Sequence, residues 1–358
     1  MEQLLLLSVA FIVILLGAEL FTNGIEWVGH HLDLAEGAVG SVLAAVGTAL
    51  PETMIPLVAI LLGSHAVEAS DTADGIGVGA ILGAPFMLST LAMFVTGVAV
   101  VIRGRGRPQG DAMPVNTGVL GKDVAWFMSA YAIAVGAAFL PSDADLLRIG
   151  VALVLLGIYA FYVKGHLSAE NVGGGQDLRP LRLHRLDRAH HRASPERPRL
   201  RVVWVQVLLA LGFIIGGAVV FVAAVESLAT GLGIEPLILA LVIAPIATEL
   251  PEKFNSVIWV RAGKDTLAMG NITGAMVFQS CIPTVIGLVF AASAWRIDTS
   301  SPESMLAFAS AGIAFLSTLA IFLPMLRGGR LLGRGLLVGG GFYVAYLVLV
   351  IVVSARGV

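Results

Sequence analysis

The sequence predicts an all-α polytopic membrane protein whose ten transmembrane helices form two inverted five-helix repeats. The first observation is composition: residues of the set AVILMFWYC make up 57% of the 358 residues and charged residues 13%, with a mean hydropathy of +0.91. This balance excludes an ordinary soluble domain. The second is that ten stretches are apolar for roughly 20 residues, enough to cross a bilayer core about 30 Å thick. The third is a polar motif that occurs twice, 200 positions apart.

The first predicted span begins almost at the N-terminus. Met1, Glu2 and Gln3 lack the basic region of a secretory signal, so we expect this span to be retained. Glycine and proline interrupt the second, third, seventh and eighth stretches, so the number of spans is better defined than their ends. The predicted spans are about 3–23, 37–63, 75–101, 123–140, 146–164, 202–228, 236–260, 268–293, 304–325 and 335–355.

Lysine and arginine fall on alternate loops, as the positive-inside rule requires of a correct topology. The loops that follow odd-numbered spans hold 18 of the 22 basic residues. The opposite side holds Arg148, Arg296 and Arg356, and Lys253 lies inside a span. We therefore predict a multi-pass protein of the inner or plasma membrane with both termini extracytoplasmic.

One long polar segment, residues 165–201, separates a first five-helix repeat (1–164) from a second (202–358). We interpret it as a basic cytoplasmic linker, although its arginines recur at helical spacing between leucines and could lay a basic helix on anionic lipid. Its four histidines show no recurring ligand spacing that would favour a metal site. The chain has 22 Lys+Arg against 24 Asp+Glu, so we expect membrane lipid as a partner and no nucleic acid.

The two halves align at an offset of 200 residues without a gap across their motifs. Because each half has five spans, an odd number, the second copy must enter the membrane upside down relative to the first. The matched pairs are Glu26 with Glu226, Thr48 with Thr248, Pro51 with Pro251 and Glu52 with Glu252, and Gly79, Gly83 and Ala84 correspond in order to Gly270, Gly274 and Ala275.

The most informative residues lie inside spans two and seven, which read GTALPE at 47–52 and ATELPE at 247–252. A carboxylate at the centre of a membrane helix costs about 2.5–3.5 kcal/mol on insertion scales, so it normally faces a partner, a cavity or an ion. The proline removes an amide hydrogen and frees carbonyls one turn back. A kink with a satisfied carboxylate would explain one such motif, but its duplication favours a site. We predict an all-oxygen cage for a hard divalent cation such as Ca²⁺, formed by Glu52, Glu252, Thr48 and Thr248.

These motifs resemble the calcium/cation antiporter superfamily, particularly its sodium/calcium exchanger branch, whose two repeats carry Gly-Thr-Ser-Leu-Pro-Glu. The segment 17–32 is similar to the beginning of the first repeat, and 270–274 resembles the Gly-Asn-x-x-Gly of the third helix. The resemblance covers roughly residues 10–95 and 210–290. It implies a ten-helix antiporter that binds Ca²⁺ at Glu52 and Glu252, with Thr48 and Thr248 completing the site and Asn271 on the adjoining helix.

The resemblance also implies alternating access, in which spans one and six slide against a rigid core. Binding of Ca²⁺ or of the counter-ions would neutralise the glutamates enough to permit the switch. An empty, doubly charged site should resist this switch. The protein would then exchange ions without letting them leak across the membrane.

The chain departs from the family pattern at several positions that would serve sodium. Ala49 and Glu249 stand where the family has serine, and Ala80 stands where the second half keeps Asn271. Where the family's third helices carry Gly-Ser followed by polar ligands, the first half has Gly83-Ala84-Pro85 with Leu88 and the second has Gly274-Ala275-Met276 with Gln279. Nearly all the missing side-chain oxygens are therefore in the first half. Glu249 could supply a third carboxylate or could pair with Lys253 one turn on. The loss of oxygens leaves both Na⁺ and H⁺ open as the counter-ion, because desolvated carboxylates can exchange protons for a metal.

We therefore expect a secondary antiporter, not an enzyme, that exchanges Ca²⁺ for Na⁺ or H⁺ by alternating access and carries no resident cofactor. The metal-site residues are Glu52, Glu252, Thr48, Thr248, Glu249, Asn271 and Gln279. One alternative is a proton-coupled exchanger of another cation. A membrane-embedded metal-dependent enzyme would instead show Asp-rich or His motifs at a membrane face, and a passive channel would show a continuous polar stripe through several spans. No nucleotide-binding motif occurs in the sequence.

Overall fold

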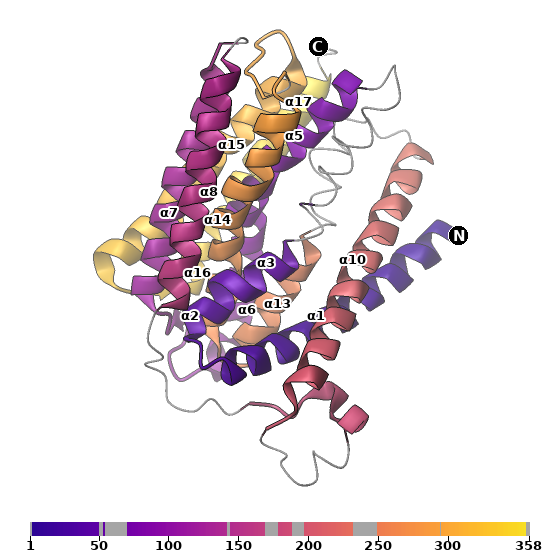
Figure 1. The fold of residues 1–358 in the computed structure, drawn as a ribbon, viewed down its shortest axis with the longest axis vertical. Helices are drawn as coiled ribbons and strands as arrows, with labels where there is room; N and C mark the ends of the chain where they lie inside the picture. Colours follow the sequence, from indigo (N-terminus) through magenta and orange to yellow (C-terminus); the bar gives the residue numbers. More distant parts are fainter. Residues whose placement is uncertain are drawn as a thin grey trace.

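The computed structural model describes residues 2–49, 53, 70–141, 144–168, 178–187, 197–231, 249–293 and 295–355. Helices dominate it (Figure 1). The first half contains α1 (Glu2–His31), α2 (Glu36–Ala38), η1 (Val39–Ala44), α3 (Ala45–Thr48), α5 (Ser70–Met87), η2 (Leu88–Ala92), α6 (Met93–Arg103), η3 (Gly104–Gly106), β1 (Ala112–Met113), α7 (Thr117–Gly136), η4 (Ala137–Phe139) and α8 (Asp145–Leu167). The remainder contains η5 (Arg182–Asp187), α10 (Leu200–Gly231), α13 (Leu250–Arg261), α14 (Asp265–Phe290), α15 (Pro302–Gly328), β2 (Leu331–Leu332), α16 (Gly333–Leu336) and α17 (Val338–Ala355).

Eight of the described helices are long and apolar enough to cross a membrane, and each coincides with one predicted span. The predicted spans 37–63 and 236–260 are described in part, as η1 with α3 and as α13. Predicted span three is one continuous rod made of α5, η2 and α6. Its middle is a π-helical segment at Leu88–Ala92, where Thr90 Oγ1 donates to the Phe86 carbonyl at 2.6 Å. The segment follows Pro85, and a proline disturbs the helical hydrogen bonds around it.

Helix α14 is the centre of the bundle and is buried along nearly its whole length. It contacts α7, α8, α5, α13, η1 and α3. Two glycines of α14, one turn apart, let the backbone of η1 cross in direct contact with the backbone of α14. A Cβ on Gly274 would lie 2.1 Å from the Ser41 carbonyl oxygen, and one on Gly270 would lie 2.9 Å from Ser41 Oγ. Small residues serve membrane helix pairs in this way because close packing replaces the hydrophobic driving force available in water.

Gly274→Val should separate η1 from α14, because the new side chain overlaps backbone atoms that cannot move independently. Overpacking of this kind costs about 1–3 kcal/mol. We expect a lower thermal unfolding temperature of the detergent-purified protein. Gly312→Val is the matched control, because Gly312 is exposed on α15 and a Cβ there meets no atom within 4 Å. Equal unfolding temperatures for the two variants would contradict the close crossing.

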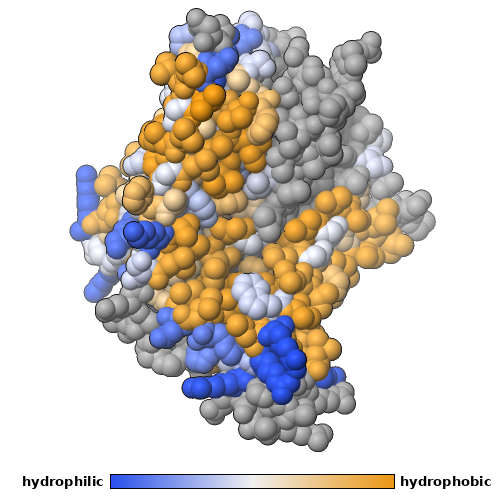
Figure 2. Space-filling model, viewed as in Figure 1, coloured by the Kyte–Doolittle hydropathy of each residue, from blue (hydrophilic) through white to orange (hydrophobic). Residues whose placement is uncertain are grey.

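Helices α1 and α10 pack along each other beside this core. In Figure 1 the pair crosses the right side of the molecule, and α1 also contacts α13 and η1 of the bundle. Gly17 and Gly217 receive Ile214 and Ile14 respectively, so each helix presents small residues to the other. The surface of this pair in Figure 2 is largely apolar, and it exposes residues such as Val9, Ile12, Val205 and Leu208. An apolar outer face is what lipid requires.

Loops that follow odd-numbered spans gather on one face. Strand β1, after predicted span three, pairs antiparallel with β2, which follows predicted span nine. Arg107 forms an ion pair with Asp265 at the start of α14, and the main-chain N–H of Asn116 donates to Thr266 Oγ1 at 3.1 Å. The structure therefore brings together the loops that the distribution of Lys and Arg assigns to one side. The N-terminal end of α1 and the C-terminal end of α17 both lie away from η5 in Figure 1.

Residues 178–187 of the linker contact α1 and α10. Asn23 Nδ2 on α1 donates to the Arg179 carbonyl at 3.3 Å, and its Oδ1 accepts from the Arg182 N–H at 2.9 Å. Gln206 on α10 accepts from the Leu183 N–H at 2.8 Å, and Leu181 is buried. This segment is therefore attached to α1 and α10 by hydrogen bonds.

Asn23→Ala should release the linker, because it removes three hydrogen bonds that Asn23 makes or accepts around residues 179–182. At about 0.5–1.5 kcal/mol for each bond, we expect tryptic cleavage after Arg182 or Arg185 to accelerate roughly tenfold in limited proteolysis. Asn116→Ala is the control, because it removes the side-chain cap of α7 and leaves the linker contacts intact. Unchanged cleavage in Asn23→Ala would mean that the linker is held by other contacts.

Candidate cation-binding site

Glu252 lies in the first turn of α13, directly after Pro251. Glu252 is buried, with 1% of its surface exposed to solvent. Neither carboxylate oxygen has a hydrogen-bond partner within the part of the chain that the structure describes. The helix N-terminus favours a negative charge here, but it does not replace the lost hydration of a buried carboxylate. The arrangement leaves both oxygens available to a cation.

Thr48 and Asn271 connect this turn to the first-half motif. Thr48 ends α3, and its hydroxyl lies 3.1 Å from the Ala44 carbonyl and 3.2 Å from Asn271 Oδ1. Asn271 Nδ2 in turn donates to the main-chain carbonyl of Glu252 at 3.4 Å. All three residues are buried. Two motif segments 200 residues apart in sequence therefore meet through one side chain of α14.

Glu249 forms an ion pair with Lys253. The ammonium lies 3.0 Å from Glu249 Oε2 and 3.4 Å from the Glu249 carbonyl oxygen. The two side chains are 1% and 5% exposed, respectively. The sequence left two roles open for Glu249: a third carboxylate ligand or pairing with Lys253. The structure shows the pairing with Lys253. Its other carboxylate oxygen, Oε1, has no partner among the described residues.

Ala49 and Glu249, at matched positions of the two motifs, have the same local backbone. Ala49 has φ −82° and ψ 2°, and Glu249 has φ −86° and ψ 10°. The main-chain N–H four residues on bonds to each carbonyl, from Thr53 at 3.2 Å and from Lys253 at 3.3 Å. Both side chains also donate to that carbonyl, the Thr53 hydroxyl at 2.9 Å and the Lys253 ammonium at 3.4 Å. This equivalence at matched positions agrees with the alignment of the two halves.

The other predicted residues are placed less completely. Gln279 is buried on α14, eight residues beyond Asn271 and so about 12 Å further along the helix. No described interaction of its side chain links it to Glu252. Glu52 and Thr248 lie outside the described residues.

Sequence reasoning missed Asn255, one turn after Glu252 on α13. It is fully buried, and neither its Oδ1 nor its Nδ2 has a partner in the described structure. An amide oxygen is a good ligand for hard cations. The i, i+3 spacing from Glu252 is the sequence signal that could have indicated it, because such residues share a helix face.

Sequence reasoning also missed Asp123, a fully buried residue on α7. Its Oδ2 accepts from Ser41 Oγ at 2.8 Å and Thr273 Oγ1 at 2.6 Å, and its Oδ1 accepts from the Tyr162 hydroxyl at 3.2 Å. His166 Nε2 lies 2.9 Å from Oδ1 and must donate, because an ionised carboxylate only accepts. These donors satisfy Asp123 and tie η1, α7, α8 and α14 together, so we assign it a structural role.

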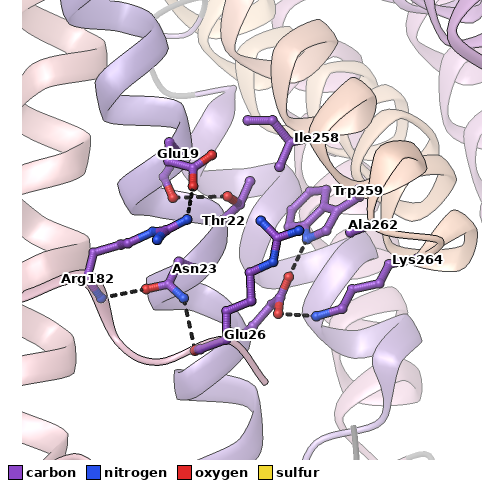
Figure 3. Close-up of a pocket in the computed structure, with 10 residues that line it drawn as sticks. Glu19, Thr22, Asn23, Glu26, Arg182, Ile258, Trp259, Ala262 and Lys264 are labelled. Atoms are coloured by element: carbon purple, nitrogen blue, oxygen red, sulfur yellow. Dashed lines mark hydrogen bonds and ion pairs between the residues drawn. The ribbon is translucent and has the colours of Figure 1, made fainter. Parts of the chain in front are cut away.

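Glu19 and Glu26 on α1 line a separate cavity of about 100 Å³ (Figure 3). Glu26 forms an ion pair with Lys264 and accepts from Trp259 Nε1 at 2.8 Å, and Glu19 forms an ion pair with Arg182. Both carboxylates therefore have partners, unlike Glu252. Within the described residues there is no group of three or more His, Cys, Asp or Glu side chains that could hold a metal.

Comparison with protein-family models identifies the family of this chain. A family model described as "Sodium/calcium exchanger protein" matches residues 2–165 and 202–354. The putative antiporter CaxA of Alkalimonas amylolytica is 24% identical over 324 residues, covering 90% of this chain and 89% of that protein. The uncharacterized membrane protein MJ0091 of Methanocaldococcus jannaschii is 42% identical over 57 residues, which are 16% of this chain and 19% of that protein.

Solved structures of the sodium-calcium exchanger NCX_Mj share the fold. One, soaked with Na⁺ and Ca²⁺, matches with a TM-score of 0.69 and 15% identity, covering 97% of this chain and 98% of that one. Another, soaked with Na⁺ and Sr²⁺, matches with a TM-score of 0.68 and 16% identity, covering 97% of each chain. The family model spans both halves and excludes only the linker region and the last residues. The chain therefore belongs to the sodium/calcium exchanger family.

Proposed function

We propose that this protein is a secondary antiporter that exchanges Ca²⁺ for Na⁺ or H⁺ by alternating access. The observation that carries the proposal is the pair of unpartnered, buried carboxylate oxygens of Glu252. Burying an ionised carboxylate without a partner is strongly unfavourable. A bound cation offsets that cost, and its departure restores it, which is the energetic basis for obligatory exchange.

The proposed ligands are all oxygen donors, which suits Ca²⁺. Glu252 supplies the carboxylate, and Asn255 lies one turn away on α13. Asn271 donates to the main-chain carbonyl of Glu252, and the Thr48 hydroxyl donates to Asn271 Oδ1. The offset of 200 residues adds Glu52 and Thr248 as the symmetry-related ligands. Gln279, further along α14, would serve a counter-ion position.

The family supports cation exchange, and the names of related proteins indicate the ions. NCX_Mj is described as a sodium-calcium exchanger whose structures were obtained with Na⁺, Ca²⁺ and Sr²⁺, and CaxA is described as a putative antiporter. The counter-ion of this chain is less constrained, because Ala49 and Ala84 add no side-chain oxygen and Glu249 is paired with Lys253.

For alternating access, we propose that α1 and α10 move as a pair against the bundle around α14. Two observations support this division. The pair is internally fastened by its own packing and by the linker, through Asn23 and Gln206. The core is fastened separately by the hydrogen bonds to Asp123 and the crossing at Gly274. The loops after odd-numbered spans would face the cytoplasm, because they hold most of the Lys and Arg residues.

Glu252→Gln should abolish calcium binding while the protein remains folded. The amide keeps the shape of the side chain and removes the charge that holds the cation. We expect calcium affinity to fall at least about tenfold, or about 1.4 kcal/mol, in equilibrium binding of calcium-45 to the purified protein. Asp298→Asn makes the same chemical change in an exposed loop and should leave affinity unchanged. Wild-type affinity in folded Glu252→Gln would refute the site.

The coupling ion can be identified in proteoliposomes. Calcium-45 uptake is measured in parallel with an outward Na⁺ gradient and an outward H⁺ gradient. Uptake driven by Na⁺ would mean that main-chain carbonyls replace the missing side-chain oxygens. Uptake driven only by H⁺ would make the carboxylates the coupling groups. Uptake under neither gradient would contradict calcium exchange.

A further inference from the structure

We propose that Lys253 is a built-in counter-cation of the site: its ammonium holds the position beside Glu249 that a mobile monovalent cation would otherwise occupy. The exchanger would then bind one monovalent counter-ion fewer than its number of site carboxylates implies. The inference rests on the proposed function, because it assigns the ion count of the same site.

The first step is the comparison between the halves. Ala49 and Glu249 occupy the same backbone conformation, so the second half adds one carboxylate that the first half lacks. Thr53 and Lys253 occupy the next equivalent position, and both donate to the carbonyl four residues back. Compared with the first half, the second half therefore carries one additional negative charge on Glu249 and one additional positive charge on Lys253. These two side chains form an ion pair.

The second step is the surroundings of the ammonium. It lies 3.0 Å from a carboxylate oxygen and 3.4 Å from a main-chain carbonyl oxygen of Glu249. A carboxylate and a carbonyl are the oxygen types that coordinate hard cations. Both side chains are at least 95% buried, so the pair is not a surface ion pair of the kind that water replaces at little cost.

The third step is the charge of the whole cage. Glu52, Glu249 and Glu252 would contribute three negative charges, and Lys253 contributes one positive charge. The remaining two negative charges match one Ca²⁺. Because Lys253 is covalently attached, it cannot be transported, and it neutralises Glu249 in every state of the cycle.

Lys253→Thr tests this inference, because it installs the residue found at the equivalent position of the first half, Thr53. The matched control is the double variant E249A/K253T, which copies both Ala49 and Thr53 and again leaves two carboxylates. Lys253→Gln is a second single variant that keeps a hydrogen-bond donor beside Glu249 and removes the charge. It provides the same comparison if Lys253→Thr fails to fold.

Two measurements apply to these proteins. The first is the reversal potential of calcium flux in proteoliposomes, which gives the number of counter-ions exchanged for each Ca²⁺. The second is equilibrium binding of sodium-22 to the purified proteins. We expect one additional counter-ion and one additional bound Na⁺ in Lys253→Thr or Lys253→Gln, and the wild-type numbers in E249A/K253T.

Identical counts in the wild type and in a folded single variant would overturn the role of Lys253. Failure of the proposed function has a different signature, because the wild type would then move no calcium under any gradient. The sodium-22 comparison still decides the role of Lys253 in that case, since it requires no transport.

Discussion

A carboxylate buried between membrane helices must be neutralised from within the protein or by an ion, because lipid offers neither water nor counter-charge. This chain meets that constraint in three ways. Asp123 is surrounded by hydrogen-bond donors from three neighbouring elements. Glu249 is paired with an ammonium on its own helix. Glu252 has neither, within the described residues. The first two solutions use groups of the protein itself. The third leaves both carboxylate oxygens available, so Glu252 is the residue that we propose for cation binding.

The position of Glu252 depends on how closely the core helices approach one another. The glycines of α14 allow η1 to cross it at backbone contact. This crossing brings Thr48 to Asn271, which also contacts the turn that carries Glu252. Asp123 holds the same crossing through Ser41 and Thr273. The core is thus a rigid frame around the site, whereas α1 and α10 form a pair with its own internal contacts. This division is the basis of the alternating access that we propose.

The sequence was sufficient for the spans, because apolar length and the alternation of basic loops are local signals. It also identified the two motifs, and their equivalence is visible in the backbone of Ala49 and Glu249. It could not identify Asp123, whose partners lie as far as 150 residues away, since only the tertiary fold brings such donors together. The linker was predicted as a separate segment. Its attachment to α1 depends on Asn23, and nothing in the sequence distinguishes Asn23 from the other polar residues of the first span. The sequence could not decide whether Glu249 pairs with Lys253 or binds a cation, because residues four apart on a helix can form an ion pair but need not do so.

The most direct test of the central claim is the position of a bound divalent cation. Anomalous diffraction from crystals of this protein soaked in Sr²⁺ would locate it without reliance on transport. We predict a peak in contact with the Glu252 carboxylate, beside Thr48 and Asn271, and none at Asp123 or Glu26, whose carboxylates already have partners. An ordered Sr²⁺ site elsewhere in the membrane region, with no peak at Glu252, would contradict the account.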